Sequence, residues 1–394
     1  MTRVPLGGID RIVRDRPLRE TVFGDRTVAL VTNDVATTAS LERSLDALVA
    51  VGVRVTHVLG PEHGLHGTGQ AGESEATVCD ERTGLPVLDT YSMSADRLTE
   101  TIRDTGAELV AIDLVDVGAR LWTYPWTTVD VLVASSRAGV PVVVLDRPNP
   151  LGGRVAEGPA LDTAYESFVG RLPIPLRHGL TMGEIATTAV QLGHAGLDDH
   201  TMLEVVTIPD PEDRGVRHLP GSPWVAPSPN LPTLDTALLY PGMCLVEGSA
   251  LSEGRGTTRP FEVIGAPWVD DRFVPALADR GLPGVRFRET HHRPTFHKYA
   301  GETVHAAFVH IVDRVAVRPV LTAVTVLEVA RDLYPERFGF RAPSTEAGTP
   351  QPSHPIDLLW GSDTLRTGLE HGEQVVELVD DASAPTPAPP LGPS

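Results

Sequence analysis

A carboxylate and two imidazoles stand together in one glycine-rich stretch, Leu59-Gly-Pro-Glu-His-Gly-Leu-His-Gly67. The apolar residues 53–59 have the composition of a β-strand, and the glycines that follow are too frequent for a helix. Open parallel sheets build their sites in the loops that follow their strands. Glu62 and His63 are therefore candidate catalytic residues. The alternative is an ordinary solvated turn between a strand and a helix.

Polar side chains also follow the other segments that have the composition of strands. Because the carboxyl ends of parallel strands lie along one edge of a sheet, we expect these groups to converge on one cleft. Each could instead cap a helix or satisfy a turn, and Asp146 with Arg147 could form a structural ion pair. The residues concerned are Asn33, Asp113, Asp116, Arg120, Tyr124, Asp146, Arg147 and Asn149.

A second polar segment, Ser252-Glu-Gly-Arg-Gly-Thr-Thr-Arg-Pro-Phe-Glu262, carries two arginines in a chain that is otherwise acidic. A planar guanidinium group can hold a carboxylate or phosphate through two hydrogen bonds. Arg255 and Arg259 are therefore candidate anion-binding residues. The alternative is a polar surface loop with internal salt bridges.

Cleavage of a sugar linkage requires two carboxyl groups across a cleft, one of them protonated near neutral pH. Glu62, next to Pro61 and the glycines, is the candidate acid. The candidate partners are Glu157, Asp116 and Asp113. Aromatic side chains that could stack on a sugar ring are Trp122, Tyr124, Trp126 and Trp224.

Three other motifs that would indicate a different class of protein are either absent or incomplete in this sequence. Gly67-Thr-Gly-Gln-Ala-Gly72 matches the dinucleotide fingerprint, yet it begins well past the end of its strand and no apolar helix follows. No phosphate-binding P-loop is present. Glu62, His63 and His66 lack the helical spacing of a zinc motif. We expect neither a cofactor nor a metal, although a metal-dependent hydrolase or deacetylase of amino sugars and a non-catalytic sugar-binding protein stay open as alternatives.

Composition limits the class of protein. The 394 residues suggest two domains, and 41% hydrophobic residues can form an ample core. A formal charge of −19 argues against nucleic acid and anionic membranes as partners. Cys79 and Cys244 are too few for a disulfide scaffold or a cysteine zinc site. Neither a leader-like N-terminus nor a run of about 18 apolar residues occurs, so we expect a cytoplasmic protein, although a processed secreted form would look the same.

The apolar pattern predicts an α/β fold: a Rossmann-like parallel sheet domain over residues 1–205, a smaller α+β C-terminal domain over 206–380, and a disordered tail over 381–394. A proline-rich linker or loop is expected at 220–232. Ser40 and Ser94 are expected N-caps, and Thr181 with Glu184 has capping-box spacing. The expected strands are 27–32, 53–59, 85–88, 109–113, 140–145, 203–207 and 304–312, and the expected helices are 41–49, 94–105, 128–138, 181–192 and 319–333.

Several of these motifs, in this order, resemble one family closely. They are Gly60-Pro-Glu-His-Gly64, Asp116-Val-Gly-Ala-Arg120, Leu145-Asp-Arg-Pro-Asn-Pro150, Glu157-Gly-Pro159, Pro227-Ser-Pro-Asn230, Tyr240-Pro-Gly242 and the 252–262 segment. The chain resembles the NamZ-type exo-β-N-acetylmuramidases, formerly a domain of unknown function, from about residue 8 to about residue 369. One departure is Asp34, where the family usually has proline.

The resemblance implies hydrolysis of terminal β-linked N-acetylmuramic acid from the non-reducing end of peptidoglycan fragments, in a cleft between two domains. The substrate would be a muropeptide or an N-acetylmuramic acid–N-acetylglucosamine disaccharide, and Arg255 and Arg259 would bind the lactyl carboxylate of muramic acid. By matching motif, Glu62 is the best candidate for the catalytic glutamate, with Glu157 favoured as its partner. Together with the residues found from the strand ends and polar segments, the catalytic candidates are Glu62, Glu157, Asp116 and His63, and the substrate-binding candidates are Asn33, Arg120, Tyr124, Asn149, Asn230, Glu253, Arg255 and Arg259.

Overall fold

The computed structural model describes residues 7–76, 78–153, 155–197, 202–208, 223–343 and 353–380. The predicted disordered tail and the first part of the predicted 220–232 linker lie outside these residues. Within the described segments, no helix has both the length and the apolar character needed to cross a lipid bilayer.

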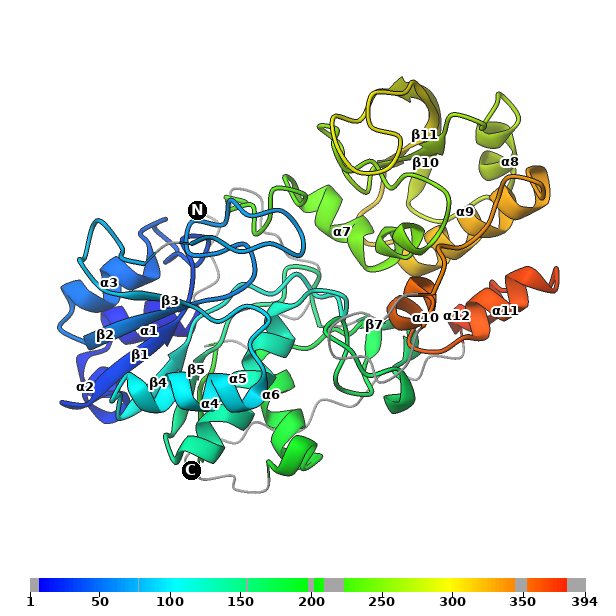
Figure 1. Cartoon of the computed structure of the whole chain (residues 1–394). Helices are drawn as coiled ribbons and strands as arrows, with labels where there is room; N and C mark the ends of the chain where they lie inside the picture. The colour runs from blue at the N-terminus through cyan, green and yellow to red at the C-terminus, as the bar shows by residue number, and fades with distance from the viewer. Residues whose placement is uncertain are drawn as a thin grey trace.

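A six-stranded sheet forms the larger part of the molecule (Figure 1). Its strand order is β3-β2-β1-β4-β5-β8, and every neighbouring pair is parallel. The strands are β1 (Thr27–Val31), β2 (Arg54–Gly60), β3 (Val87–Asp89), β4 (Leu109–Ile112), β5 (Val142–Leu145) and β8 (Leu203–Val206). Apolar strands without alternation suit a sheet that is covered on both faces. The predicted α/β class and its parallel sheet are confirmed.

Successive residues of each strand enter two different cores. Val28 and Leu30 of β1 pack with Ile9 and Leu48, whereas Val31 and its same-face neighbours pack in the other core. Helices α1 (Gly8–Arg14), α2 (Arg16–Val22) and α3 (Ser44–Ala50) therefore cover one face. Helices α4 (Ala95–Asp104), α5 (Tyr124–Ala138) and α6 (Met182–Gln191) cover the other.

Two of the three predicted helix caps are present. The Ser94 hydroxyl accepts a hydrogen bond from the Arg97 amide, 3.3 Å away, at the start of α4. Thr181 and Glu184 form a reciprocal capping box on α6. The prediction for Ser40 is wrong, because α3 begins four residues later and Leu41 has a φ of 65°, which no right-handed helix accommodates.

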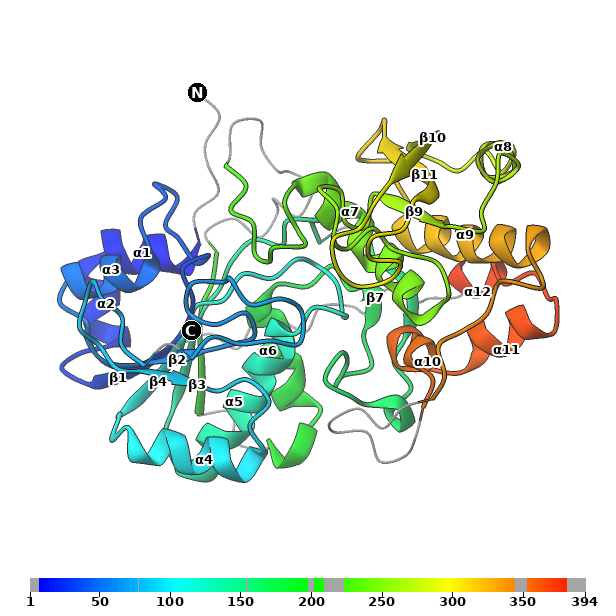
Figure 2. The same ribbon diagram turned by 45° about the horizontal axis from the view of Figure 1, so that its top comes forward.

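A smaller part follows the sheet in sequence and lies beside it (Figures 1 and 2). It contains an antiparallel sheet in the order β10-β11-β9, with β11 and α9 at the positions predicted for residues 304–312 and 319–333. The elements are α7 (Leu234–Met243), η4 (Cys244–Gly248), β9 (Val263–Ala266), α8 (Phe273–Asp279), β10 (Val285–His292), β11 (Val304–Ile311), α9 (Pro319–Leu333), α10 (Pro355–Trp360), α11 (Thr364–Glu370) and α12 (Glu377–Asp380).

Close packing of α7 on α9 depends on one glycine. A Cβ atom at Gly242 would lie 1.9 Å from the carbonyl oxygen of Pro319, so only glycine allows the two backbones to approach this closely. The remaining described elements are β6 (Glu157–Ala160) and β7 (Pro175–Arg177), which form an antiparallel pair, and the 3₁₀ turns η1 (Thr163–Tyr165) and η2 (His194–Gly196).

One continuous core joins the two parts. It contains Val129 of α5 together with Leu238 of α7, Val324 of α9 and Trp360 of α10. The two parts therefore share buried apolar surface, and the expected boundary between residues 205 and 206 stays a prediction.

Candidate active site

A pocket of about 520 Å³ opens between the loops of the parallel sheet and the smaller part. Pockets of this size and largely apolar lining are typical small-molecule sites. From the sheet side it is lined by Glu62, His63, Gln70, Ala71, Gly72, Glu73, Leu121, Trp122, Thr123, Phe168 and Val169; from the rest of the chain it is lined by Ser228, Asn230, Leu231, Tyr240, Cys244, Glu247, Arg255, Phe261, Phe296, His297, Arg341, Pro355, Leu358 and Leu359.

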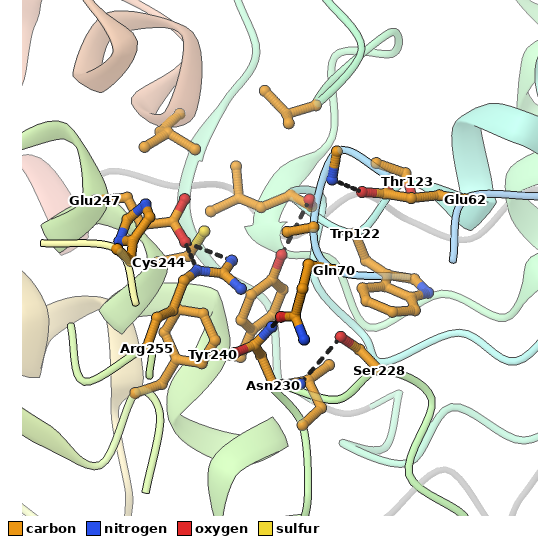
Figure 3. A pocket seen from close by; sticks show the side chains of 18 of the residues that line it. Glu62, Gln70, Trp122, Thr123, Ser228, Asn230, Tyr240, Cys244, Glu247 and Arg255 are labelled. Carbon is orange, nitrogen blue, oxygen red and sulfur yellow. Dashed lines mark hydrogen bonds and ion pairs between the residues drawn. The ribbon is translucent and has the colours of Figure 1, made fainter. Parts of the chain in front are cut away.

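Glu62 is held at one side of this pocket (Figure 3). It stands two residues after the end of β2 and is 6% exposed. The Gly72 amide donates to Oε1 at 2.7 Å, and the Thr123 hydroxyl donates to Oε2. An amide can only donate, whereas a hydroxyl can also accept, so Oε2 is the oxygen that can carry a proton while both contacts are kept.

A second set of polar groups fixes the backbone of Glu62 from behind. The Asn33 side-chain amide donates to the Tyr124 hydroxyl at 2.7 Å, and that hydroxyl donates to the Glu62 carbonyl at 3.1 Å. Burial raises the pKa of Tyr124, so its hydroxyl stays a neutral donor. Asn33 and Tyr124 therefore position Glu62 and do not line the pocket themselves.

The glycine-rich loop after β2 folds around its own side chains. His63, with a φ of 71°, lines the pocket, and its Nδ1 donates to the Gly69 carbonyl at 2.8 Å. Gly64 has a φ of +78°, and a Cβ atom there would lie 2.5 Å from the side chain of Glu75. The Glu75 carboxylate accepts hydrogen bonds from the amides of His66 and Thr68. The glycines thus let this loop wrap a carboxylate and present Glu62 and His63 to the pocket.

Glu247 and Arg255 occupy the opposite side of the pocket in Figure 3. Both Nε and Nη2 of Arg255 lie 2.5 Å from Oε1 of Glu247. Within the described residues no hydrogen bond reaches Oε2 of Glu247. This carboxylate therefore has one oxygen fixed by a cation and the other available to a ligand.

A buried ionic cluster lies behind Arg255. Glu253 is fully buried, with His297 Nδ1 at 3.0 Å, Lys298 Nζ at 3.1 Å and Arg255 Nε at 3.7 Å from its carboxylate oxygens. Burial alone would raise the pKa of Glu253, but Lys298, His297 and Arg255 together lower it to about 2. Glu253 thus orients two residues of the pocket, Arg255 and His297, without lining it.

Aromatic and amide side chains form the wall between the two carboxylates. The Tyr240 hydroxyl donates to the Leu121 carbonyl at 3.2 Å, and the Trp122 and Tyr240 rings meet edge to face with centroids 6.4 Å apart. The Asn230 side chain donates to Oε1 of Gln70 at 3.0 Å. Aromatic faces next to amides suit a sugar, which has both apolar C–H faces and hydroxyls.

Cys244 is the one thiol among the residues that line this pocket. Burial raises the pKa of this thiol well above its ordinary value of 9.0. It therefore stays protonated at neutral pH and is a poor nucleophile.

Three predicted catalytic carboxylates lie outside the pocket lining. Glu157 of β6 accepts the Leu321 amide at 2.8 Å and pairs with Arg318 at 3.4 Å. Asp116 is buried with Oδ2 at 3.4 Å from His178 Nε2. Asp113 binds Arg147 through two hydrogen bonds of 2.6 and 2.9 Å, so the ion-pair partner of Arg147 is Asp113, whereas Asp146, the partner considered from the sequence, accepts the backbone amide of Arg147. The structure does not bring these carboxylates together with Glu62.

Three predicted substrate-binding residues also lie outside the pocket lining. Arg120 is fully buried and donates to the carbonyls of four residues, including Leu359 and Trp360 of α10, and its burial lowers its pKa to about 9. The Asn149 side chain donates to the Leu180 carbonyl and accepts the Leu151 amide in a local turn. The Arg259 side chain is 49% exposed and pairs with Glu262. The four hydrogen bonds of Arg120 therefore connect the two parts of the molecule.

A group that could hold a metal ion lies elsewhere, on the antiparallel sheet. Glu289, His291 and His305 have ligand atoms within 4.8 Å of one another. In the pocket loop, His66 Nδ1 lies 2.9 Å from Asp34, whose hydrogen bond raises the pKa of His66. The His66 and His63 rings thus have separate partners and do not converge with Glu62 on one ligand position.

The sequence reasoning missed several residues that line the pocket. Thr123 and Gln70 were overlooked because each lies in a loop with no periodic pattern. Glu247 and Arg341 follow no predicted parallel strand, so the strand-end argument could not find them. A signal for Glu247 did exist, since it stands five residues before the polar segment that begins at Ser252.

Comparisons with known proteins cover most of the chain and agree with one another. The family models "Exo-beta-N-acetylmuramidase NamZ, N-terminal" and "Exo-beta-N-acetylmuramidase NamZ, C-terminal" match residues 28–235 and 238–386. The peptidoglycan beta-N-acetylmuramidase NamZ of Bacillus subtilis is 36% identical over 376 residues, which cover 95% of this chain and 86% of that protein.

Two crystal structures of DUF1343 family proteins from Bacteroides fragilis have the same fold. One has a TM-score of 0.80 and 27% identity, with 96% of this chain and 95% of the other covered. The second has a TM-score of 0.70 and 24% identity, with 95% and 93% covered.

Proposed function

This chain belongs to the exo-β-N-acetylmuramidase NamZ family, and from that premise we propose that its pocket releases terminal β-linked N-acetylmuramic acid from the non-reducing end of peptidoglycan fragments. The chain is a glycoside hydrolase that acts on peptidoglycan. The observation that carries the site assignment is that Glu62 and Glu247 face one sugar-sized pocket from its two sides (Figure 3).

Glu62 is the proposed general acid. As the bond between C1 and the glycosidic oxygen breaks, a proton moves from Oε2 of Glu62 to that oxygen, and the Thr123 hydroxyl then donates to the carboxylate that remains. The Gly72 amide holds the other oxygen throughout.

Glu247 is the proposed second carboxylate, in place of Glu157. The transition state of glycoside hydrolysis carries positive charge at C1 and the ring oxygen, and a nearby carboxylate stabilises that charge. Arg255 fixes one oxygen of Glu247, and the other faces the pocket. Glu73 also lines the pocket, but it is exposed and accepts the Gln70 amide within its own loop.

The two roles can be separated by the leaving group. A nitrophenyl muramide needs little protonation of its leaving oxygen, whereas an N-acetylmuramic acid–N-acetylglucosamine disaccharide needs a general acid. Glu62→Gln should lower kcat about 10²- to 10⁴-fold on the disaccharide and much less on the nitrophenyl glycoside. Glu247→Gln should lower both rates alike.

Glu73→Gln serves as the comparison and should cost less than about tenfold on either substrate. If Glu62→Gln keeps most of its activity on the disaccharide, the assignment of the acid is wrong. If Glu73→Gln loses activity and Glu247→Gln does not, Glu73 is the second carboxylate. Following the anomer first released by NMR shows whether Glu247 acts as nucleophile or as base.

The metal-dependent alternative has its own test. Nδ1 of His63 donates to a backbone carbonyl and both oxygens of Glu62 accept hydrogen bonds, so we expect excess chelator to leave disaccharide cleavage unchanged. Loss of activity with chelator and its return with added Zn²⁺ would favour a metallohydrolase.

The expected cytoplasmic location also stays a prediction, which fractionation of the source cells would test.

A further inference from the structure

The basic side chains that line the pocket differ in whether they have an acidic partner. Arg255 is paired with Glu247 at 2.5 Å and Glu253 at 3.7 Å, and His297 is paired with Glu253 at 3.0 Å. The guanidinium of Arg341 makes neither an ion pair nor a hydrogen bond with any residue that the structure describes. It is an exposed cation at the pocket, in a chain whose formal net charge is −19.

The backbone of Arg341 is nevertheless fixed. Its amide donates to the Gly248 carbonyl at 2.9 Å, and its own carbonyl accepts from His354 Nδ1 at 2.8 Å. Immediately before it, Phe340 forms an antiparallel bridge with Ser249. Residues 339–341 are thus paired with the segment directly after Glu247, so the arginine has an anchored Cα atom and a side chain that is available to a ligand.

We propose that Arg341 is a specificity-determining residue that binds the lactyl carboxylate of N-acetylmuramic acid, which rests on the function proposed above. Muramic acid differs from glucosamine by this 3-O-lactyl group. A guanidinium can hold a carboxylate through two parallel charge-assisted hydrogen bonds. Arg255 differs from Arg341 because its Nε and Nη2 already contact Glu247, so its charge is compensated before a ligand binds.

The proposal corrects the expectation for the two arginines of the 252–262 segment. Arg259 lies outside the pocket lining, and Arg255 is already neutralised by two carboxylates. Arg341 follows β11 and α9 in sequence and meets the pocket only because residues 339–341 pair with residues 248–250.

The test compares three nitrophenyl substrates: the N-acetylmuramide with a free lactyl carboxylate, the same muramide with that carboxylate converted to a primary amide, and the N-acetylglucosaminide. Arg341→Gln should lower kcat/KM on the free acid about 10- to 100-fold. It should leave kcat/KM on the amide and the glucosaminide close to the wild-type values. Arg341→Lys should recover part of the loss, because charge is kept but the bidentate geometry is not.

Arg337→Gln is the matched control, since Arg337 is also exposed, stands four residues earlier and does not line the pocket. It should leave all three values unchanged. If Arg341→Gln keeps the wild-type preference for the free acid, the proposal is overturned. The same holds if Arg259→Gln removes that preference and Arg341→Gln does not.

Failure of the proposed function can be told apart from failure of this inference. If the wild-type protein cleaves none of the substrates, the glycosidase assignment fails. Calorimetric binding of free N-acetylmuramic acid and N-acetylglucosamine then decides the role of Arg341. Tighter binding of N-acetylmuramic acid that disappears in Arg341→Gln supports the subsite, and an unchanged ratio or no binding overturns it.

Discussion

Replacing Glu253 by glutamine tests the ionic cluster behind the pocket. The carboxylate is fully buried and is surrounded by Lys298, His297 and Arg255 at 3.1, 3.0 and 3.7 Å. Glutamine has nearly the same shape but no charge. The variant therefore leaves Arg255, Lys298 and His297 without their common anionic partner, and two of those residues line the pocket.

The expected loss follows from the pKa of Glu253. Its fall from an ordinary 4.5 to about 2 corresponds to about 3 kcal/mol of folding free energy at neutral pH. Because the pKa is lower in the folded protein, this contribution is fully present above pH 4.5 and is lost as the pH falls toward 2. At pH 3.5 about 2 kcal/mol of it should still be present.

Urea unfolding of wild type and Glu253→Gln between pH 7 and pH 3.5 measures this difference. We expect the free energy of unfolding of Glu253→Gln to be about 3 kcal/mol lower than that of the wild type at pH 7, and this difference to be smaller at pH 3.5. Glu289→Gln is the control, because Glu289 pairs with His305 at the surface and its removal should cost less than about 1 kcal/mol. A gap below about 1 kcal/mol at pH 7, or one that does not change with pH, would refute the reasoning.

Three further predictions concern single side chains. Thr123→Val removes the hydroxyl donor to Glu62 and should lower kcat on the disaccharide about tenfold, whereas Thr127→Val in the helix that follows should not. Steady-state kinetics of both variants tests this. Burial raises the pKa of Asp146 from 3.8 to about 6, so the wild type should lose about 2 kcal/mol of stability from this group as the pH rises from 4 to 6. A melting-temperature series in which Asp146→Asn shows the same loss would contradict this. Gly242→Ala should cost about 3 kcal/mol, because its Cβ atom would overlap a backbone carbonyl at the start of α9; wild-type stability in urea would show that the helices can move apart.

The local sequence pattern was sufficient to predict the parallel sheet. Continuous apolar runs such as residues 109–112 have few alternatives to a strand buried on both faces, and the capping box of Thr181 and Glu184 is a local hydrogen-bonding unit. The loop that carries Glu62 was also found from the sequence, because its glycines follow a strand directly. By contrast, Ser40 was chosen on propensity alone, and the chain turns through a positive φ at Leu41 instead.

Tertiary contacts determine whether each polar side chain stabilises the fold or lines the pocket. Asp113, Glu157 and Arg120 have the residue types of a sugar-binding site, yet each is buried among partners that are distant in sequence. Burying a charged side chain is costly unless it has a partner. A charged side chain that is paired with a nearby opposite charge or carbonyl group therefore stabilises the fold and is not available to a ligand.

The chain therefore determined by itself the sheet, the family resemblance and the placement of one glutamate in a glycine-rich loop. Only the folded chain decided that Glu247 and Arg341, from segments with no strand-end signal, would line the same pocket as Glu62. The physical reason is that a strand or a turn is specified by neighbouring residues, whereas the charge and exposure of a side chain depend on which distant segments pack around it.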